Sequence, residues 1–201
     1  MVMQNFDAVI VEAKSGQELF CHGDLSSDIK LINFWRWSQS DLLNNSLRGV
    51  LAEFIVAQDL GKTTGSRVEW DAFDIITKDG VKIEVKSSAY LQSWKQKKLS
   101  NIAFDIRPTF GFCEETNSYT LGLQRQSDFY VFCLLKHKDK ATVNPLDLDQ
   151  WRFFVLPTTI LNERVASQKS ISLNSLLKLQ PFECKFGEIK ETIEAKSKHL
   201  F

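Results

Sequence analysis

The chain has 201 residues, of which 43% are hydrophobic and 25% are charged, as is ordinary for a soluble globular protein. Its 25 Lys and Arg residues balance its 25 Asp and Glu residues. The zero net charge excludes a bulk polycation acting on nucleic acid but leaves room for a local basic patch. This length predicts a single domain over residues 1–201, with a core at about 41–156, an N-terminal extension and a C-terminal helical segment.

The spacing of the cysteines and the length of the apolar runs exclude further classes of protein. The four cysteines are far apart and form no C-x-x-C pair, which argues against a disulfide framework and a structural zinc site. No apolar run approaches the roughly 20 residues of a membrane span, and the N-terminus does not resemble a signal peptide. We therefore expect a cytoplasmic protein without a membrane partner.

The first half of the chain holds one clear helix. Residues 1–40 are hard to interpret, and DAVIVEA at 7–13 is their only candidate strand. From Asp41, apolar side chains recur at helical spacing until Gly61, which suits a helix C-terminus. The predicted helix is apolar on most sides, so we expect it to be packed on two sides.

The rest of the chain has the pattern of strands followed by helices. Residues 108–127 are expected to hold a loop and a short helix, and the tail from about 172 contains two helix-like stretches. The last two predicted strands are apolar throughout, which favours interior strands covered on both faces. The order predicts an α/β (α+β) domain with a mixed central sheet flanked by helices. The predicted strands lie at about 68–77, 81–88, 101–107, 129–135 and 151–156.

A turn between the first two predicted strands sets their register. A three-residue loop ending at Gly80 pairs Ile75 with Ile83 and keeps the apolar side chains on one face, whereas a two-residue loop mixes the faces. Such a loop needs a left-handed residue at its end, and glycine adopts that conformation without steric cost. The register therefore predicts that Asp74 lies directly across from Glu84.

Two facing carboxylates repel each other and destabilise a sheet unless a cation offsets them. Lys86 lies on the same predicted face as Glu84, but one ammonium does not neutralise two carboxylates. A divalent cation such as Mg²⁺, which favours one or two carboxylates with waters and phosphate oxygens, would complete the neutralisation. The alternative is a half-buried antiparallel strand whose charged face is simply solvated.

The stretch FDIITKDGVKIEVKSS, preceded by a helix that carries Glu53, resembles the PD-(D/E)xK nuclease superfamily with its restriction-endonuclease-like fold. The residue before Asp74 is Phe rather than Pro. The resemblance implies that Asp74, Glu84 and the Val85 carbonyl bind Mg²⁺, with Mn²⁺ as a substitute. It also implies that Lys86 orients or activates the attacking water.

By the same resemblance, Glu53 is the helix carboxylate that supports the metal. Its alternative is a surface residue, or a partner of Arg48 or another cation.

Polar and basic residues after the motif are candidates for nucleic-acid binding. Between Lys82 and Arg107 there are six cations and two acids, so a local positive charge lies beside the predicted site. Trp94 is a candidate for stacking on a base, or equally for core packing. The alternative for Ser87 and Ser88 is that they simply end the strand, and the alternative for the lysines is a solvated loop. The candidate binding residues are Ser87, Ser88, Gln92, Lys95, Lys97 and Lys98.

Two functions follow from these residues. The first is a Mg²⁺-dependent nuclease that hydrolyses DNA, of the restriction, repair or junction-cutting type. The second is a catalytically inactive module on the same fold that binds DNA or a protein. The sequence contains no separate recognition domain, so we expect specificity to come from a homodimer or a partner subunit.

Overall fold

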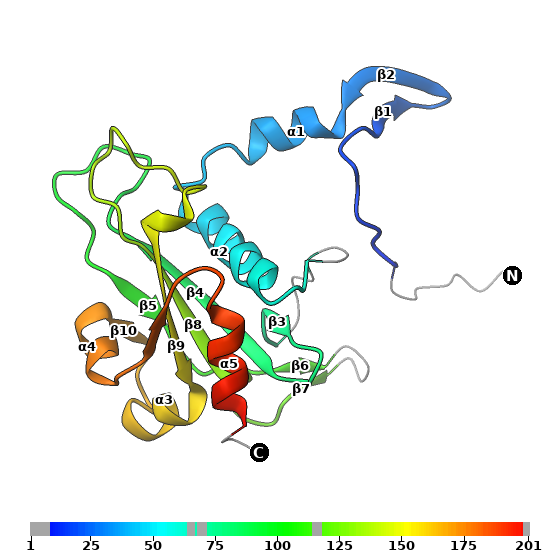
Figure 1. Ribbon diagram of the computed structural model, residues 1–201. Helices are drawn as coiled ribbons and strands as arrows, with labels where there is room; N and C mark the ends of the chain where they lie inside the picture. Colours follow the sequence, from blue (N-terminus) through cyan, green and yellow to red (C-terminus); the bar gives the residue numbers. More distant parts are fainter. Residues whose placement is uncertain (1–8, 64–66, 68–71, 114–117, 199–201) are drawn as a thin grey trace, which may run out of the picture. The chain divides into compact units, whose positions relative to one another are not determined.

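The computed structural model describes residues 9–63, 67, 72–113 and 118–198 (Figure 1). The chain divides into two units. The smaller unit, Met1–Ser40 with Thr63–Arg67, contains the hairpin of β1 (Leu19–His22) and β2 (Leu25–Lys30) and the helix α1 (Leu31–Ser38). The main unit, Asp41–Lys62 with Val68–Phe201, contains the other elements and all of the candidate site residues.

A five-stranded mixed sheet forms the centre of the main unit, in the order β11-β9-β8-β4-β3. Strands β4 and β8 are parallel, and the other pairs are antiparallel. This confirms the predicted α+β class with a central mixed sheet. The strands are β3 (Ile75–Ile76), β4 (Lys82–Ala89), β8 (Phe129–Leu135), β9 (Trp151–Pro157) and β11 (Phe182–Cys184).

Alternate side chains of each strand point to opposite faces of the sheet, and both faces carry apolar side chains. A separate layer therefore covers each face. One face packs against α2 (Asn45–Asp59) and α5 (Ile189–Ser197). The other packs against the short strands β5 (Ala103–Asp105) and β10 (Ser170–Ser172) and the helices α3 (Thr158–Arg164) and α4 (Leu173–Lys178). Every residue of β8 is buried, which confirms that its apolar run is an interior strand.

The predicted helix at 41–61 is α2, and its ends have local causes. Asn44 accepts a hydrogen bond from the Ser46 N–H at its start. Gly61 follows its end with φ of +66°, a left-handed conformation that glycine adopts readily. Among the described residues, none of the helices is both long and apolar enough to cross a bilayer.

Some predicted elements were wrong. The described part of 108–127 contains no helix; it forms a hairpin of β6 (Phe112–Cys113) and β7 (Ser118–Tyr119), in which the Phe112 and Tyr119 rings lie 5.2 Å apart. Residues 9–13 of DAVIVEA are not a strand, and 7–8 lie outside the described residues. The strand predicted at 68–77 shrinks to β3, with 68–71 outside the described residues. An apolar pattern alone does not form a strand, because a strand also needs a neighbouring strand for its backbone hydrogen bonds.

A buried arginine joins α2 to the sheet. Arg48 is 3% exposed. Its Nε donates to Ser87 Oγ (3.2 Å), Nη1 donates to Leu43 O (2.9 Å) and Gln92 Oε1 (3.3 Å), and Nη2 donates to Asn45 Oδ1 (2.8 Å). Burial lowers the pKa of Arg48. The guanidinium therefore ties the start of α2 to the end of β4 and to the segment that follows it.

Arg48→Met should lower the free energy of unfolding by about 2–3 kcal/mol, because it leaves the buried oxygens that accept hydrogen bonds from Arg48 without a donor. Urea denaturation measures the change. Arg164→Met, at the exposed end of α3, is the matched control and should change stability by less than about 0.5 kcal/mol. Equal effects of the two substitutions would contradict the anchoring role of Arg48.

Candidate active site

The hairpin of β3 and β4 has the predicted register. Ile75 pairs with Ile83, and the Thr77 N–H donates to the Val81 carbonyl at 2.9 Å. Gly80 ends the three-residue loop with φ of +81°. The alternation of apolar side chains and the glycine therefore place Asp74 at the position across from Glu84, as predicted.

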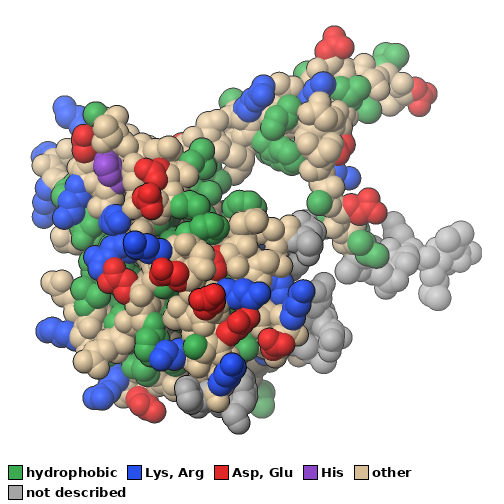
Figure 2. Space-filling view, viewed as in Figure 1, with side chains coloured by type: hydrophobic (Ala, Val, Ile, Leu, Met, Phe, Trp, Pro, Cys, Tyr) green, Lys and Arg blue, Asp and Glu red, His purple; other side chains and the backbone are tan. Residues whose placement is uncertain are grey.

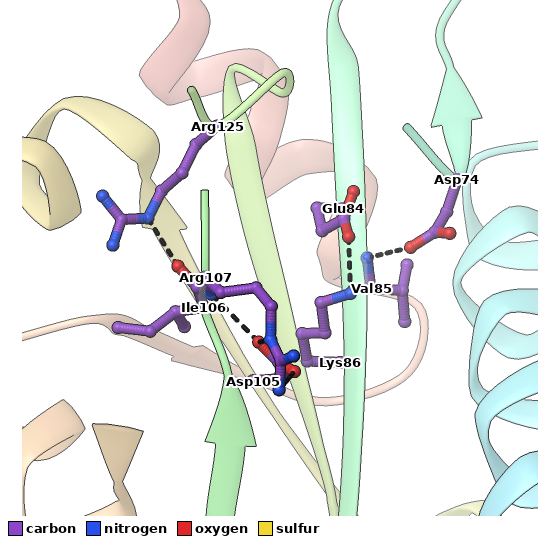
Figure 3. A network of polar contacts seen from close by, with 8 residues as sticks. All are labelled: Asp74, Glu84, Val85, Lys86, Asp105, Ile106, Arg107 and Arg125. Carbon is purple, nitrogen blue, oxygen red and sulfur yellow. Dashed lines mark hydrogen bonds and ion pairs between the residues drawn. The ribbon is translucent and has the colours of Figure 1, made fainter. Parts of the chain in front are cut away.

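The ladder between the two strands ends at Asp74, whose side chain takes the place of a backbone partner. In a continued ladder the Val85 N–H would bond to the carbonyl of Phe73. Instead it donates to Asp74 Oδ2 at 2.6 Å (Figure 3). The N–H and C=O of one strand residue point to the same side, so the Val85 carbonyl also lies on the Asp74 side of β4. Asp74 is thus fixed at the end of a strand, beside a backbone carbonyl.

The surroundings of Asp74 disfavour its negative charge. Burial and the nearby carboxylate of Glu84 raise the pKa of Asp74 to about 7, with a smaller contribution from Glu53. The Val85 hydrogen bond and the charge of Lys86 oppose this rise in pKa. At neutral pH, Asp74 is therefore poised between its protonated and ionised forms, a property common at functional sites.

The raised pKa of Asp74 predicts how stability changes with pH. Between about pH 4 and pH 7, the native carboxyl keeps a proton that the unfolded chain has released, so the free energy of unfolding falls as pH rises through this window. Asp74→Asn should remove this contribution and stabilise the metal-free protein at pH 8, since it removes the buried charge. Urea denaturation at pH 5 and pH 8 in EDTA measures both effects.

The control for this pH prediction is Asp79→Asn in the exposed turn, which should leave the pH dependence unchanged. A wild-type stability that rises between pH 5 and pH 8, with the same rise in Asp74→Asn, would contradict the prediction.

Glu84 and Lys86 form an ion pair on β4. Lys86 Nζ lies 2.5 Å from Glu84 Oε1, and the Lys86 side chain is 28% exposed and that of Glu84 is 19% exposed. Burial alone lowers the pKa of Lys86, but the charge of Glu84 and its hydrogen bond outweigh burial, so the pKa is raised. Lys86 is therefore a cation at neutral pH, held next to the two carboxylates (Figure 3).

Glu53 extends from α2 near enough to Asp74 to raise its pKa. Glu53 therefore contributes to the electrostatics of Asp74, and its support of a metal stays a prediction. The alternative partner for Glu53 was Arg48. The four hydrogen bonds that anchor Arg48 go to neutral oxygens instead, which argues against that pairing.

Two of the predicted binding residues, Ser88 and Gln92, are buried, and Ser87 is half-buried. Ser88 is 8% exposed and Gln92 is 6% exposed. Ser87 and Gln92 both accept hydrogen bonds from Arg48, and the Gln92 amide also donates to Ser100 Oγ at 3.3 Å. These contacts argue against direct binding of a nucleic acid and give these residues a structural part in shaping the segment after β4.

The predicted lysines are accessible, and a second loop adds to them. Lys95, Lys97 and Lys98 lie in the segment after β4, where Trp94 is 52% exposed rather than packed in the core. The loop after β8 lies beside this segment, because Lys140 Nζ donates to the Trp94 carbonyl and Lys138 Nζ lies 4.7 Å from the centre of the Tyr90 ring.

Since β4 and β8 are parallel, their following loops meet at one end of the sheet, where Figure 2 shows basic side chains gathered at the upper left. We call Lys95, Lys97, Lys98, Lys138 and Lys140 the basic loop cluster. The lysines of the second loop were missed from the sequence because nothing local indicates that the two loops are neighbours.

Other missed residues surround Lys86. Asp105 ends β5 and Arg107 follows it, and Tyr130 on β8 pairs with Glu84 in the register of the sheet. Together with Glu84 and Lys86 they line a polar hollow of about 240 Å³. From the sequence, Asp105 and Arg107 entered only the charge balance of residues 82–107, and nothing local placed them beside Lys86.

The donor set fits a hard divalent cation. Among the residues that the structure describes, no three His, Cys, Asp or Glu side chains form a ready-made metal cluster. Mg²⁺, however, takes few protein ligands and keeps several waters. Asp74 and Glu84 with the Val85 carbonyl supply three oxygens of the preferred kind, and a cation there would favour the ionised form of Asp74 against the burial and the carboxylate repulsion that raise its pKa.

The fold and these side chains define an α+β protein whose central mixed sheet carries an acidic pair and a lysine where its edge strand ends. The chain belongs to the bacteriophage T4 endonuclease IV family, whose model matches residues 31–175 and so includes every candidate site residue. This family membership agrees with the predicted nuclease class. Comparison with curated proteins found no match.

Proposed function

We propose that this protein is a divalent-metal-dependent nuclease that hydrolyses phosphodiester bonds in DNA. The observation that carries the proposal is the arrangement of Asp74, Glu84 and Lys86, with Asp74 fixed on the Val85 N–H and Lys86 paired with Glu84. Membership of a family named for an endonuclease supports it. The same arrangement, with Glu53 beside it, supports assignment to the PD-(D/E)xK superfamily and its restriction-endonuclease-like fold.

Each residue has a distinct part in this proposal. Asp74, Glu84 and the Val85 carbonyl would hold Mg²⁺ or Mn²⁺. When bound, the cation supplies Lewis-acid polarisation of the phosphate and a water of lowered pKa. Lys86 keeps its charge next to this position, so its ammonium can donate a hydrogen bond to the attacking water or to an oxygen that gains charge. The partial burial of the pair limits competing water and strengthens these interactions.

The basic loop cluster is proposed to hold the DNA backbone. From Glu84 to the end of β4 there are five residue steps, about 16 Å of strand, so one bound DNA segment can reach both the site and the loops. Lysines neutralise phosphates without regard to sequence. They therefore supply affinity rather than chemistry.

The triple change Lys95/Lys97/Lys98→Ala should weaken DNA binding equally for different sequences. The slope of log affinity against log salt should fall by about 0.7–0.9 for each phosphate that the protein no longer neutralises. Fluorescence anisotropy across a salt series measures this slope. The control is Lys185/Lys190→Ala, outside the cluster, and an effect as large as that of the triple change would contradict the assignment of the cluster.

The second candidate is a catalytically inactive module that binds DNA or a protein. The presence of Asp74, Glu84 and Lys86 in one place favours the enzyme, because a module without catalysis has no chemical need for all three. Incubation of the protein with single-stranded, duplex and branched DNA in Mg²⁺, Mn²⁺ or EDTA separates the two. Binding without cleavage in every metal would support the module and overturn the nuclease proposal.

A further inference from the structure

The hollow beside Lys86 is lined mainly by polar side chains. Glu84, Lys86, Asp105 and Arg107 contribute charged groups, and Thr109, Gln126 and Tyr130 contribute neutral hydrogen-bonding groups. Its volume of about 240 Å³ is smaller than the roughly 300–1,000 Å³ of most small-molecule pockets. A space of this size and polarity suits one small polar unit rather than an apolar ligand.

Arg107 is held firmly by Asp105 yet remains accessible. Its Nε donates to Asp105 Oδ1 at 3.0 Å, its Nη2 lies 2.7 Å from Oδ2, and its side chain is 60% exposed. These contacts with Asp105 use one edge of the guanidinium and leave Nη1 on its other side. A guanidinium held along one edge presents its remaining donors in a fixed direction, which suits the planar recognition of a phosphate.

The backbone around this pair is also held in place. Arg125 is 8% exposed, and its Nε donates to the carbonyl of Ile106, the residue between Asp105 and Arg107, at 2.8 Å (Figure 3). Its Nη1 donates to Asn162 Oδ1 on α3 at 2.8 Å. The charged side of the hollow is therefore anchored to the covering helix layer.

Gln126, which also lines the hollow, packs against Gly111. A Cβ at Gly111 would lie 2.8 Å from both Cδ and Oε1 of Gln126, so the glycine leaves room for the Gln126 amide in its present position. The Gln126 amide donates to the Thr109 carbonyl at 3.2 Å, and its Oε1 accepts from Gln124 at 3.1 Å. Its Nε2 also lies 3.5 Å from the Gln124 carbonyl, so both amide hydrogens are used, and the second lone pair of Oε1 remains to accept a hydrogen bond from a base or sugar.

We propose that this hollow is a nucleotide subsite that takes the nucleotide next to the bond that is cleaved, a proposal that rests on the nuclease function above. Arg107 binds the phosphate of that nucleotide, and Thr109 and Gln126 face its sugar or base. Asp105 is a positioning residue that orients Arg107. The subsite shares Lys86 with the reacting centre, so an occupied hollow places the adjacent phosphodiester at Lys86.

The first test compares three variants by anisotropy of a fluorescein-labelled oligodeoxynucleotide in EDTA. Arg107→Gln should lower affinity about tenfold, as expected for the loss of a charged hydrogen bond. Asp105→Asn, which keeps the cation, should lower affinity less than about threefold, and Arg164→Gln on exposed α3 should leave it unchanged. A merely structural ion pair predicts equal losses for Asp105→Asn and Arg107→Gln, which would overturn the subsite.

The second test uses deoxyadenosine 5′-monophosphate titrated into the ¹⁵N-labelled wild-type protein. Shifts of the Arg107, Thr109 and Gln126 signals are expected, with inorganic phosphate shifting Arg107 alone. If the protein cuts no DNA but the nucleotide shifts these signals, the nuclease proposal fails and the hollow is a nucleotide-binding site without a cleaved bond beside it. If DNA is cut while the nucleotide shifts none of them, the subsite is overturned and the nuclease proposal stands.

Discussion

Replacing Lys86 by alanine is expected to lower the single-turnover rate of DNA cleavage by about 10²–10⁴-fold, the range for loss of a positioned proton donor or charge-stabilising group. Its affinity for DNA should fall less than about tenfold, because the lysines of the basic loop cluster remain. The reason for the separation is geometric. Lys86 lies 2.5 Å from Glu84, next to the acidic pair, whereas the cluster lies beyond the end of β4.

Lys82→Ala is the matched control for Lys86. Lys82 lies on the same strand and on the same face, four residues away, and stacks over the Phe73 ring at 5.3 Å rather than against Glu84. It should retain nearly the wild-type cleavage rate. Similar rate losses in both variants would mean that the rate depends on positive charge along the strand rather than on the position of Lys86. That result would contradict a catalytic role for Lys86.

The double change Asp74→Asn/Glu84→Gln is expected to abolish both cleavage and stabilisation by metal. A cation that binds only the folded protein, present at about 100 times its Kd, stabilises it by about 2.7 kcal/mol, which is roughly 5–10 °C in Tm for a chain of this size. Wild type should show this rise in Mn²⁺ or Mg²⁺ relative to EDTA. The double variant should show none, because the two amides lack the negative charge that a hard cation requires.

Asp79→Asn serves as the control for the metal test, since Asp79 lies in the exposed turn of the same hairpin. It should keep the full metal-induced rise in Tm. A rise that persists in the double variant would place the ion away from the acidic pair and remove the chemical basis of the proposed function.

The parts of the site that could be predicted are those fixed by local sequence. Gly80 and the alternation of apolar side chains decide the register of the hairpin, so the position of Asp74 across from Glu84 follows from residues close together in the chain. The apolar runs of β8 and β9 identify the interior strands for the same reason. The hydrogen bond between Asp74 and the Val85 N–H was not predicted, because it depends on where the ladder ends.

The parts that could not be predicted depend on contacts between distant segments. Gln92 has the sequence context of a surface residue, yet it is buried and accepts a hydrogen bond from Arg48, 44 positions earlier. The strands β6 and β7 have two residues each, too few to produce a period-2 pattern. The hollow unites β4, β5 and β8, and only the fold places Asp105 and Arg107 beside Lys86.

The most direct test of the central claim is the single-turnover rate of DNA cleavage by wild type and Glu84→Gln in Mg²⁺ and in EDTA. Glu84 contacts Lys86 and contributes to the raised pKa of Asp74, so its substitution affects both the lysine and the acidic pair. We predict cleavage by wild type in Mg²⁺, none in EDTA, and a loss of at least about 10²-fold in Glu84→Gln. Cleavage that persists in EDTA, or that is unchanged in Glu84→Gln, would contradict the claim that the acidic pair and Lys86 form a metal-dependent nuclease site.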